Sequence, residues 1–83
     1  MTSSISIKNL HFKVTVDDIY HLFSKYGEVT ECRLILNERN ETRGFAFITF
    51  KRRHDAAEAL KSLADFKFYG RPIDINWANQ IQI

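Results

Sequence analysis

The chain has 83 residues, of which 45% are hydrophobic and 27% are charged, as in an ordinary globular domain. This length suits one domain with a modest core, which excludes a deep enclosed active site. The formal net charge of +2 permits a polyanionic partner without requiring one. The single cysteine, Cys32, excludes an internal disulfide, and no apolar run is long enough to span a membrane. We therefore expect an intracellular domain with no membrane partner.

Glycine and proline are few, and they separate the predicted elements. Four segments alternate between apolar and polar side chains, which predicts four β-strands that each bury one face. Two segments repeat apolar side chains every three or four residues, which predicts amphipathic helices. In chain order the predictions are a strand at Ile5–Leu10, a helix after Thr15, strands at Val29–Leu36 and Arg43–Phe50, a helix opening at Asp55, a turn at Tyr69–Pro72 and a strand at Ile73–Trp77.

The two predicted helices carry different boundary signals. Thr15 is a good N-cap for the first helix, and Asp18 completes an acidic variant of the capping box. Gly27 is predicted to end that helix in the left-handed conformation. The buried stripe of the second helix is predicted at Ala56, Ala59, Leu60 and Leu63.

The order β-α-β-β-α-β predicts an α+β, ferredoxin-like fold, in which two helices cover one face of a four-stranded antiparallel sheet. The other face of the sheet is then open to solvent. In the third strand, Phe45 and Phe47 alternate with the apolar set Ala46, Ile48 and Phe50, so they are expected on the open face.

A contiguous pair of exposed rings usually marks a binding surface. The rest of the open face is predicted to hold Ser6, Lys8, Arg33, Ile35, Asp74 and Asn76, with Arg43 at the start of the third strand. Flat rings among cations and amides suit stacked bases and a phosphate chain.

Two motifs resemble those of a known family, the RNA recognition motif. Arg43–Phe50, with the sequence RGFAFITF, fits the octapeptide of that family if Ile is allowed for Val. Ile5–Leu10 is similar to the family's hexapeptide on the first strand. The resemblance implies a domain at residues 4–79 with a C-terminal tail at 80–83. The segment Phe50–Ala57 and the closing residues Asn76–Ala78 resemble the g subunit of eukaryotic translation initiation factor three. The closing residues also resemble those of splicing regulators, so the subfamily stays open.

The resemblance implies roles for individual residues. Phe45 and Phe47 would form the stacking platform, and Arg43 would reach a phosphate. Three further positions resemble base- or phosphate-contacting residues of the family, namely Lys8, Asn76 and Asn79. Ser6 departs from the pattern, because the family normally places an aromatic ring there.

The resemblance assigns no definite role to two other cations and one aromatic ring. Arg33 lies on the predicted open face, and Lys51 opens the basic run Lys51–Arg53, which is either a solvated loop or an extension of a phosphate contact. Trp77 has the parity of the buried side chains of its strand, so it is predicted to face the core, with base stacking as the alternative role.

We expect a monomeric single-stranded RNA-binding module of mRNA processing or translation, located in the nucleus, the cytoplasm or both. Other proteins of a ribonucleoprotein complex are possible partners. The histidines show no metal-ligand spacing, and no nucleophile–base pair or phosphate-cradling loop is apparent, so neither a metal, a cofactor nor an enzymatic activity is expected. The alternative left open is a protein-interaction module on the same fold.

Overall fold

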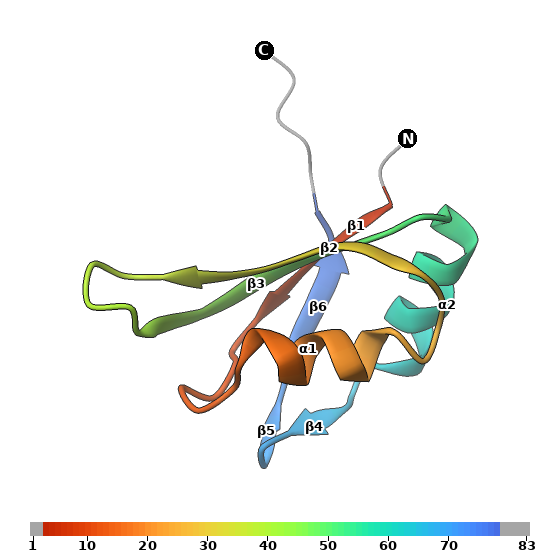
Figure 1. Ribbon diagram of the computed structural model, residues 1–83. Coiled ribbons are helices and arrows are strands. Elements are labelled where there is room, and N and C mark those ends of the chain that lie inside the picture. The colour runs from red at the N-terminus through yellow and green to blue at the C-terminus, as the bar shows by residue number, and fades with distance from the viewer. Residues whose placement is uncertain (1–2, 79–83) are drawn as a thin grey trace.

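A computed structural model describes residues 3–78 of the chain (Figure 1). The main strands are β1 (Ser4–Lys8), β2 (Val29–Leu36), β3 (Thr42–Phe50) and β6 (Asp74–Trp77). The remaining elements are the helices α1 (Val16–Phe23) and α2 (Arg53–Ser62) and a short hairpin of β4 (Lys67–Phe68) and β5 (Arg71–Pro72). The predicted β-α-β-β-α-β order is confirmed, with this hairpin added before the last strand.

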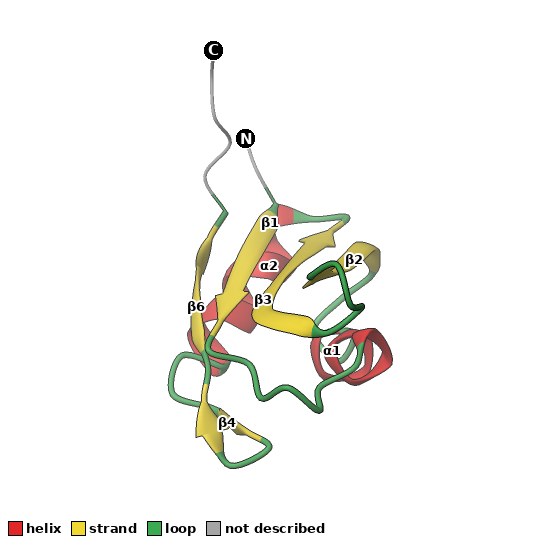
Figure 2. Cartoon of the chain, turned by 90° about the vertical axis from the view of Figure 1, so that its left-hand side faces the viewer, coloured by secondary structure: helices red, strands yellow, loops and turns green. Residues whose placement is uncertain are grey.

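The four main strands form one antiparallel sheet in the order β2-β3-β1-β6. Helix α1 packs on β2, whereas α2 packs on β1, β3 and β6. Both helices lie on the same side of the sheet, below it in Figure 1, and in Figure 2 the strands stand in front of α2. The ferredoxin-like prediction is therefore confirmed, and one face of the sheet is left without a helix.

The core lies between the helices and the inward-facing residues of the sheet. Strand residues Ile5, Ile7, Ala46, Ile48 and Phe50 are fully or almost fully buried. The ring of Phe50 meets that of Phe23 from α1, with centroids 6.3 Å apart. The alternation predicted for the first and third strands is thus confirmed.

The first helix begins as predicted and ends earlier than predicted. The backbone N–H of Asp18 donates to Thr15 Oγ1 at 3.1 Å, and the N–H of Thr15 donates to Asp18 Oδ2 at 3.0 Å, so the capping box is formed. The helix stops at Phe23, and its C-cap is Ser24 in the right-handed conformation.

The prediction of a left-handed cap at Gly27 is wrong, because the positive-φ glycines are Gly44 and Gly70. Glycine is needed at position 27 for space instead. A Cβ there would collide with the carboxylate of Asp55, which lies on α2. The turn after α1 therefore approaches α2 more closely than another residue type would allow.

The second helix begins at Arg53, two residues before the predicted Asp55. Its N-cap, Arg52, makes no capping side-chain hydrogen bond, so no local signal marks this start. The guanidinium carbon of Arg53 lies 4.1 Å from the centroid of the Trp77 ring, so a cation–π contact joins the first turn of the helix to the last strand. The predicted stripe is buried at Ala56, Ala59 and Leu63 and half-buried at Leu60.

The predicted turn at Tyr69–Pro72 proves to be part of the β4–β5 hairpin. Tyr69 and Gly70 occupy its two central positions with φ of 55° and 78°. Positive φ at both positions gives a tight turn whose twist matches paired strands.

Candidate functional site

The open face of the sheet brings most of the predicted site residues together in two cross-strand rows. The first row is Arg33, Phe47, Ser6 and Asn76, and the second is Phe45, Lys8 and Asp74. Directly opposite residues on one face have Cβ atoms about 5 Å apart, so side chains within each row touch or nearly touch. The strands that carry these rows are seen side by side in Figure 2.

Two rings stand in the middle of this face. Phe45 and Phe47 contact each other edge to face, with centroids 4.9 Å apart and planes at 75°. Both side chains are half-buried, although their strand neighbours Ala46 and Ile48 are fully buried. The rings therefore offer apolar surface to solvent on the side of the sheet that the helices do not cover.

A shallow hollow of about 490 Å³ lies beside the rings. It is lined by Ser6, Lys8, Phe45, Phe47, Asn76 and Trp77. Ser6 is the small member of its row, directly between Phe47 and Asn76, so its short side chain leaves the space open. The open face is therefore concave at Ser6, the position where the resembled family normally has an aromatic ring.

Hydrogen bonds order the polar side of this hollow. Ser6 Oγ donates to the carbonyl oxygen of Asn76 at 3.5 Å, a long bond, and Asn76 Nδ2 donates to Asp74 Oδ1 at 3.3 Å. Asp74 was predicted on the open face but not among the site residues. Asp74 does not itself line the hollow, but the register places it opposite Lys8, which does.

The charges of the open face nearly balance. Arg33 Nε lies 3.8 Å from Glu31 Oε2, and both side chains are more than half exposed, so this ion pair is weak. Lys8 lies directly opposite Asp74, a residue of opposite charge, across the β1–β6 pair. The face therefore attracts a polyanion only modestly.

Arg43 and Lys51 are both exposed and lie near opposite ends of β3, so the structure does not bring them together. Between Arg43 and the rings, Gly44 has a φ of +74°, and a Cβ there would lie 3.3 Å from the carbonyl oxygen of Leu10. The octapeptide glycine is thus required by its backbone conformation and by a close neighbour.

Trp77 is half-buried and packs against the core cluster, which confirms its predicted direction. The stacking of Arg53 on its ring draws one cation of the basic run toward the helix side. Asn79, predicted to read base edges, lies outside the described residues.

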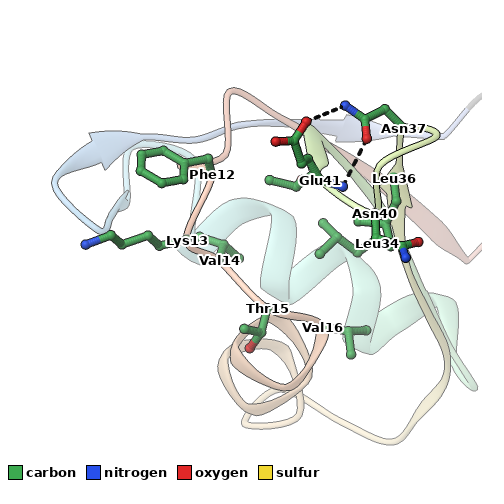
Figure 3. Close-up of a pocket in the computed structure, with 11 residues that line it drawn as sticks. Phe12, Lys13, Val14, Thr15, Val16, Leu34, Leu36, Asn37, Asn40 and Glu41 are labelled. Carbon is green, nitrogen blue, oxygen red and sulfur yellow. Dashed lines mark hydrogen bonds between the residues drawn. The ribbon is translucent and has the colours of Figure 1, made fainter.

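A second concave surface lies away from the open face and was not found from the sequence. It is a groove of about 920 Å³ between the loop before α1 and the β2–β3 hairpin (Figure 3). Phe12, Val16 and Leu36 border it and are 71%, 41% and 45% exposed. On the hairpin side, Asn37 Nδ2 donates to Glu41 Oε1 at 3.0 Å. The available signal was Phe12, which stands between the polar residues His11 and Lys13.

The loop before α1 is held by contacts with the β4–β5 hairpin. Tyr69 Oη donates to Asp18 Oδ2, and Arg71 Nη2 donates to Asn9 Oδ1 at 2.6 Å. The bond from Tyr69, followed by the backbone N–H of Thr15, lowers the pKa of the Asp18 carboxyl below its usual value. The same bond raises the pKa of the Tyr69 hydroxyl. These bonds join the segment that follows β1 and the first turn of α1 to the β4–β5 hairpin.

The remaining chemical groups do not suggest a reactive centre. Burial, followed by the charge of Asp17, raises the pKa of the Cys32 thiol to about 11, so the thiol is protonated at neutral pH. Within residues 3–78 no group of three or more His, Cys, Asp or Glu side chains is placed to hold a metal ion. No helix in that part of the chain is long and apolar enough to cross a membrane.

Comparisons with known proteins agree with this geometry. A family model described as the RNA recognition motif matches residues 5–74. The chain is 37% identical over 79 residues to Multiple RNA-binding domain-containing protein 1 of Dictyostelium discoideum, covering 95% of this chain but only 9% of that protein. It is 35% identical over 79 residues to the Splicing factor 3B subunit 6-like protein of Schizosaccharomyces pombe, covering 95% of this chain and 67% of that relative.

The fold is also similar to solved structures. The crystal structure of RNA binding protein PG1 superposes with a TM-score of 0.92 at 31% sequence identity, covering 99% of this chain and 100% of that one. The match thus extends over essentially the whole domain.

Proposed function

Since this chain belongs to the RNA recognition motif family, we propose that it binds single-stranded RNA on the open face of its sheet. The observation that carries the proposal is the pair of half-exposed rings, Phe45 and Phe47, on the face that no helix covers. Every base has a π-face, so such rings hold single strands with little dependence on sequence. The names of the relatives, which include a splicing factor, support a role in mRNA processing, with translation as the other setting.

Different residues of the open face are proposed to contact different parts of the RNA. Phe45 and Phe47 stack bases, Arg33 and Arg43 contact phosphates, and Lys8 contacts a base or a phosphate. Ser6 and Asn76 hydrogen-bond to bases or sugars within the hollow. Asn79 and Lys51 are proposed to extend the contact beyond the two rows.

The balance of charge limits the electrostatic part of binding. Glu31 and Asp74 offset part of the positive charge on the face. We expect on the order of three phosphate contacts, which gives a slope near −2 for log K against log salt. An isolated domain of this kind should therefore bind weakly at physiological salt.

The experiment that tests the proposal is a titration of a labelled mixed-sequence oligonucleotide followed by fluorescence anisotropy. Phe47→Ala should weaken binding by about 1–3 kcal/mol, as the loss of one stacked base does. Phe12→Ala is the matched control, because it also removes an exposed ring but from the groove rather than from the open face. Equal affinities for wild type and Phe47→Ala would contradict the proposal.

A second candidate function, a protein-interaction module, is favoured by the groove that Phe12, Val16 and Leu36 border. Protein binding to that groove would be insensitive to Phe47→Ala and sensitive to Phe12→Ala. Wild-type protein that fails to bind any oligonucleotide at low salt would move this candidate into first place.

The proposal includes the scope of the module. We assign it to residues 4–79, with 80–83 as a tail, and infer that it binds RNA as a monomer without catalysing a reaction. Other proteins of a ribonucleoprotein complex are proposed as further partners, in the nucleus, the cytoplasm or both. These assignments concern the domain, since the chain spans 9% of the Dictyostelium relative.

A further inference from the structure

We propose that the hollow beside Ser6 reads a guanine base and that Asp74 is the residue that selects it. The inference rests on the proposed RNA-binding function and deepens it by naming the base and the selecting side chain. It begins from the presence of an acidic side chain on a face that binds a polyanion.

Asp74 requires an explanation on this surface. It is exposed and lies on the same face as Phe45 and Lys8, in one cross-strand row. A carboxylate there repels phosphates, so it weakens the sequence-independent part of RNA binding. It favours binding where it accepts hydrogen bonds from a ribose 2′-hydroxyl or from a base, and only the contact with a base selects sequence.

The geometry leaves this carboxylate able to accept. Asn76 Nδ2 donates to one of its oxygens, Oδ1, at the long distance of 3.3 Å. An ionised carboxylate has about four lone-pair sites on its two oxygens, so acceptor capacity remains. The adjoining hollow of about 490 Å³ has room for a base because Ser6 is small.

The chemistry of the four bases then decides which one fits. On its pairing edge guanine presents two adjacent donors, N1–H and N2–H, which match the two oxygens of a carboxylate. Adenine and cytosine present one amino donor beside an acceptor, and uracil presents one N–H between two carbonyl oxygens. A carboxylate therefore favours guanine most and uracil least.

The other residues around the hollow support the same base. Lys8 stands opposite Asp74 and is a donor for the O6 and N7 acceptors of guanine. Phe47 borders the hollow on the β3 side and provides apolar surface for the base. Lys8 and Phe47 line the hollow, and Asp74 lies next to it, opposite Lys8 and hydrogen-bonded to the lining residue Asn76.

The test uses uridine heptamers that carry guanine, adenine, cytosine or uracil at the centre, with binding measured by fluorescence anisotropy. Wild-type protein should prefer the guanine heptamer over the uracil heptamer by about ten-fold, the lower part of the range for a bidentate base contact. A heptamer with central inosine, which lacks the N2 amino group, should lose most of that preference. This probe needs no change in the protein.

Asp74→Asn should abolish the preference for guanine. Glu58→Gln is the matched control, because it removes one exposed carboxylate from α2 on the far side of the sheet. It makes the same change in net charge and should keep the ten-fold ratio.

The outcomes separate this inference from the proposed function. Equal binding of all four heptamers, or an unchanged guanine preference in folded Asp74→Asn, would contradict guanine selection by Asp74 but not the proposal that the protein binds RNA. Failure of the wild type to bind any heptamer at low salt would overturn both.

Discussion

Replacing Phe50 with alanine should destabilise the domain, whereas replacing Phe47 should mainly weaken RNA binding. The two residues are of one type and lie three positions apart on β3, but they occupy opposite faces of the sheet. Phe50 is 1% exposed and packs on Phe23, while Phe47 is half-buried and contacts Phe45. The pair therefore tests the assignment of faces on which the proposed RNA site depends.

The magnitudes follow from these surroundings. Truncation of a buried phenylalanine costs about 3–5 kcal/mol, because the lost transfer free energy adds to that of the cavity left behind. A domain of this length has a free energy of unfolding of about 4–12 kcal/mol, so Phe50→Ala removes a large share. For Phe47→Ala the loss of the edge-to-face pair costs only about 0.5–1.5 kcal/mol beyond buried area.

Both variants can be measured with two assays. Thermal unfolding followed by circular dichroism should show a fall in Tm on the order of 20 °C for Phe50→Ala and a small fall for Phe47→Ala. Anisotropy titrations at a temperature where both are folded should show the RNA-binding defect in Phe47→Ala. A Phe50→Ala protein as stable as the wild type would refute the assigned strand parity and, with it, the argument for the site.

Three further predictions concern single side chains. Arg43→Ala should flatten the slope of log K against log salt by about 0.7, because one phosphate contact is lost. Phe45→Ala should lower the affinity at an unchanged slope, because stacking releases no counterions. RNA binding that does not depend on salt would contradict the phosphate contacts. Ser6→Phe should add a third ring on which a base stacks and strengthen RNA binding by about 1–3 kcal/mol, measured by anisotropy, and weaker binding by a folded variant would show that the position does not lack a ring. Because burial raises the pKa of the Cys32 thiol to about 11, native protein at pH 8 should react with iodoacetamide about a hundred-fold more slowly than protein unfolded in urea, and equal rates would show that the thiol is not protected.

Patterns within single strands and turns were sufficient to predict much of this protein. Side chains of a strand alternate between faces, so the order of residues in β3 alone separates Phe45 and Phe47 from the buried Phe50. The capping box at Thr15 was predictable for a similar reason, since its bonds join residues three apart. Gly44, the glycine of the octapeptide, is partly a local feature as well, because its backbone has a positive φ that favours glycine.

Contacts between distant segments decided the rest. Whether Gly27 caps a helix or makes room for Asp55 depends on the packing of α2 beside the end of α1. At the start of α2, Arg53 stacks on the ring of Trp77, more than 20 residues further along the chain. Neither partner lies within the few residues that a capping signal spans.

The candidate site likewise combines features that a single strand determines with features that only the tertiary structure determines. The alternation within each strand placed Ser6, Lys8, Asp74 and Asn76 on the open face, but only the register of β1 against β3 and β6 made them neighbours of the rings and of one another. Register is set by the fit of whole strands against the helices and by the turns between them. The faces of the strands were therefore local properties of the sequence, whereas the hollow lined by the two rings and a lysine, with the carboxylate of Asp74 opposite that lysine, required the tertiary structure.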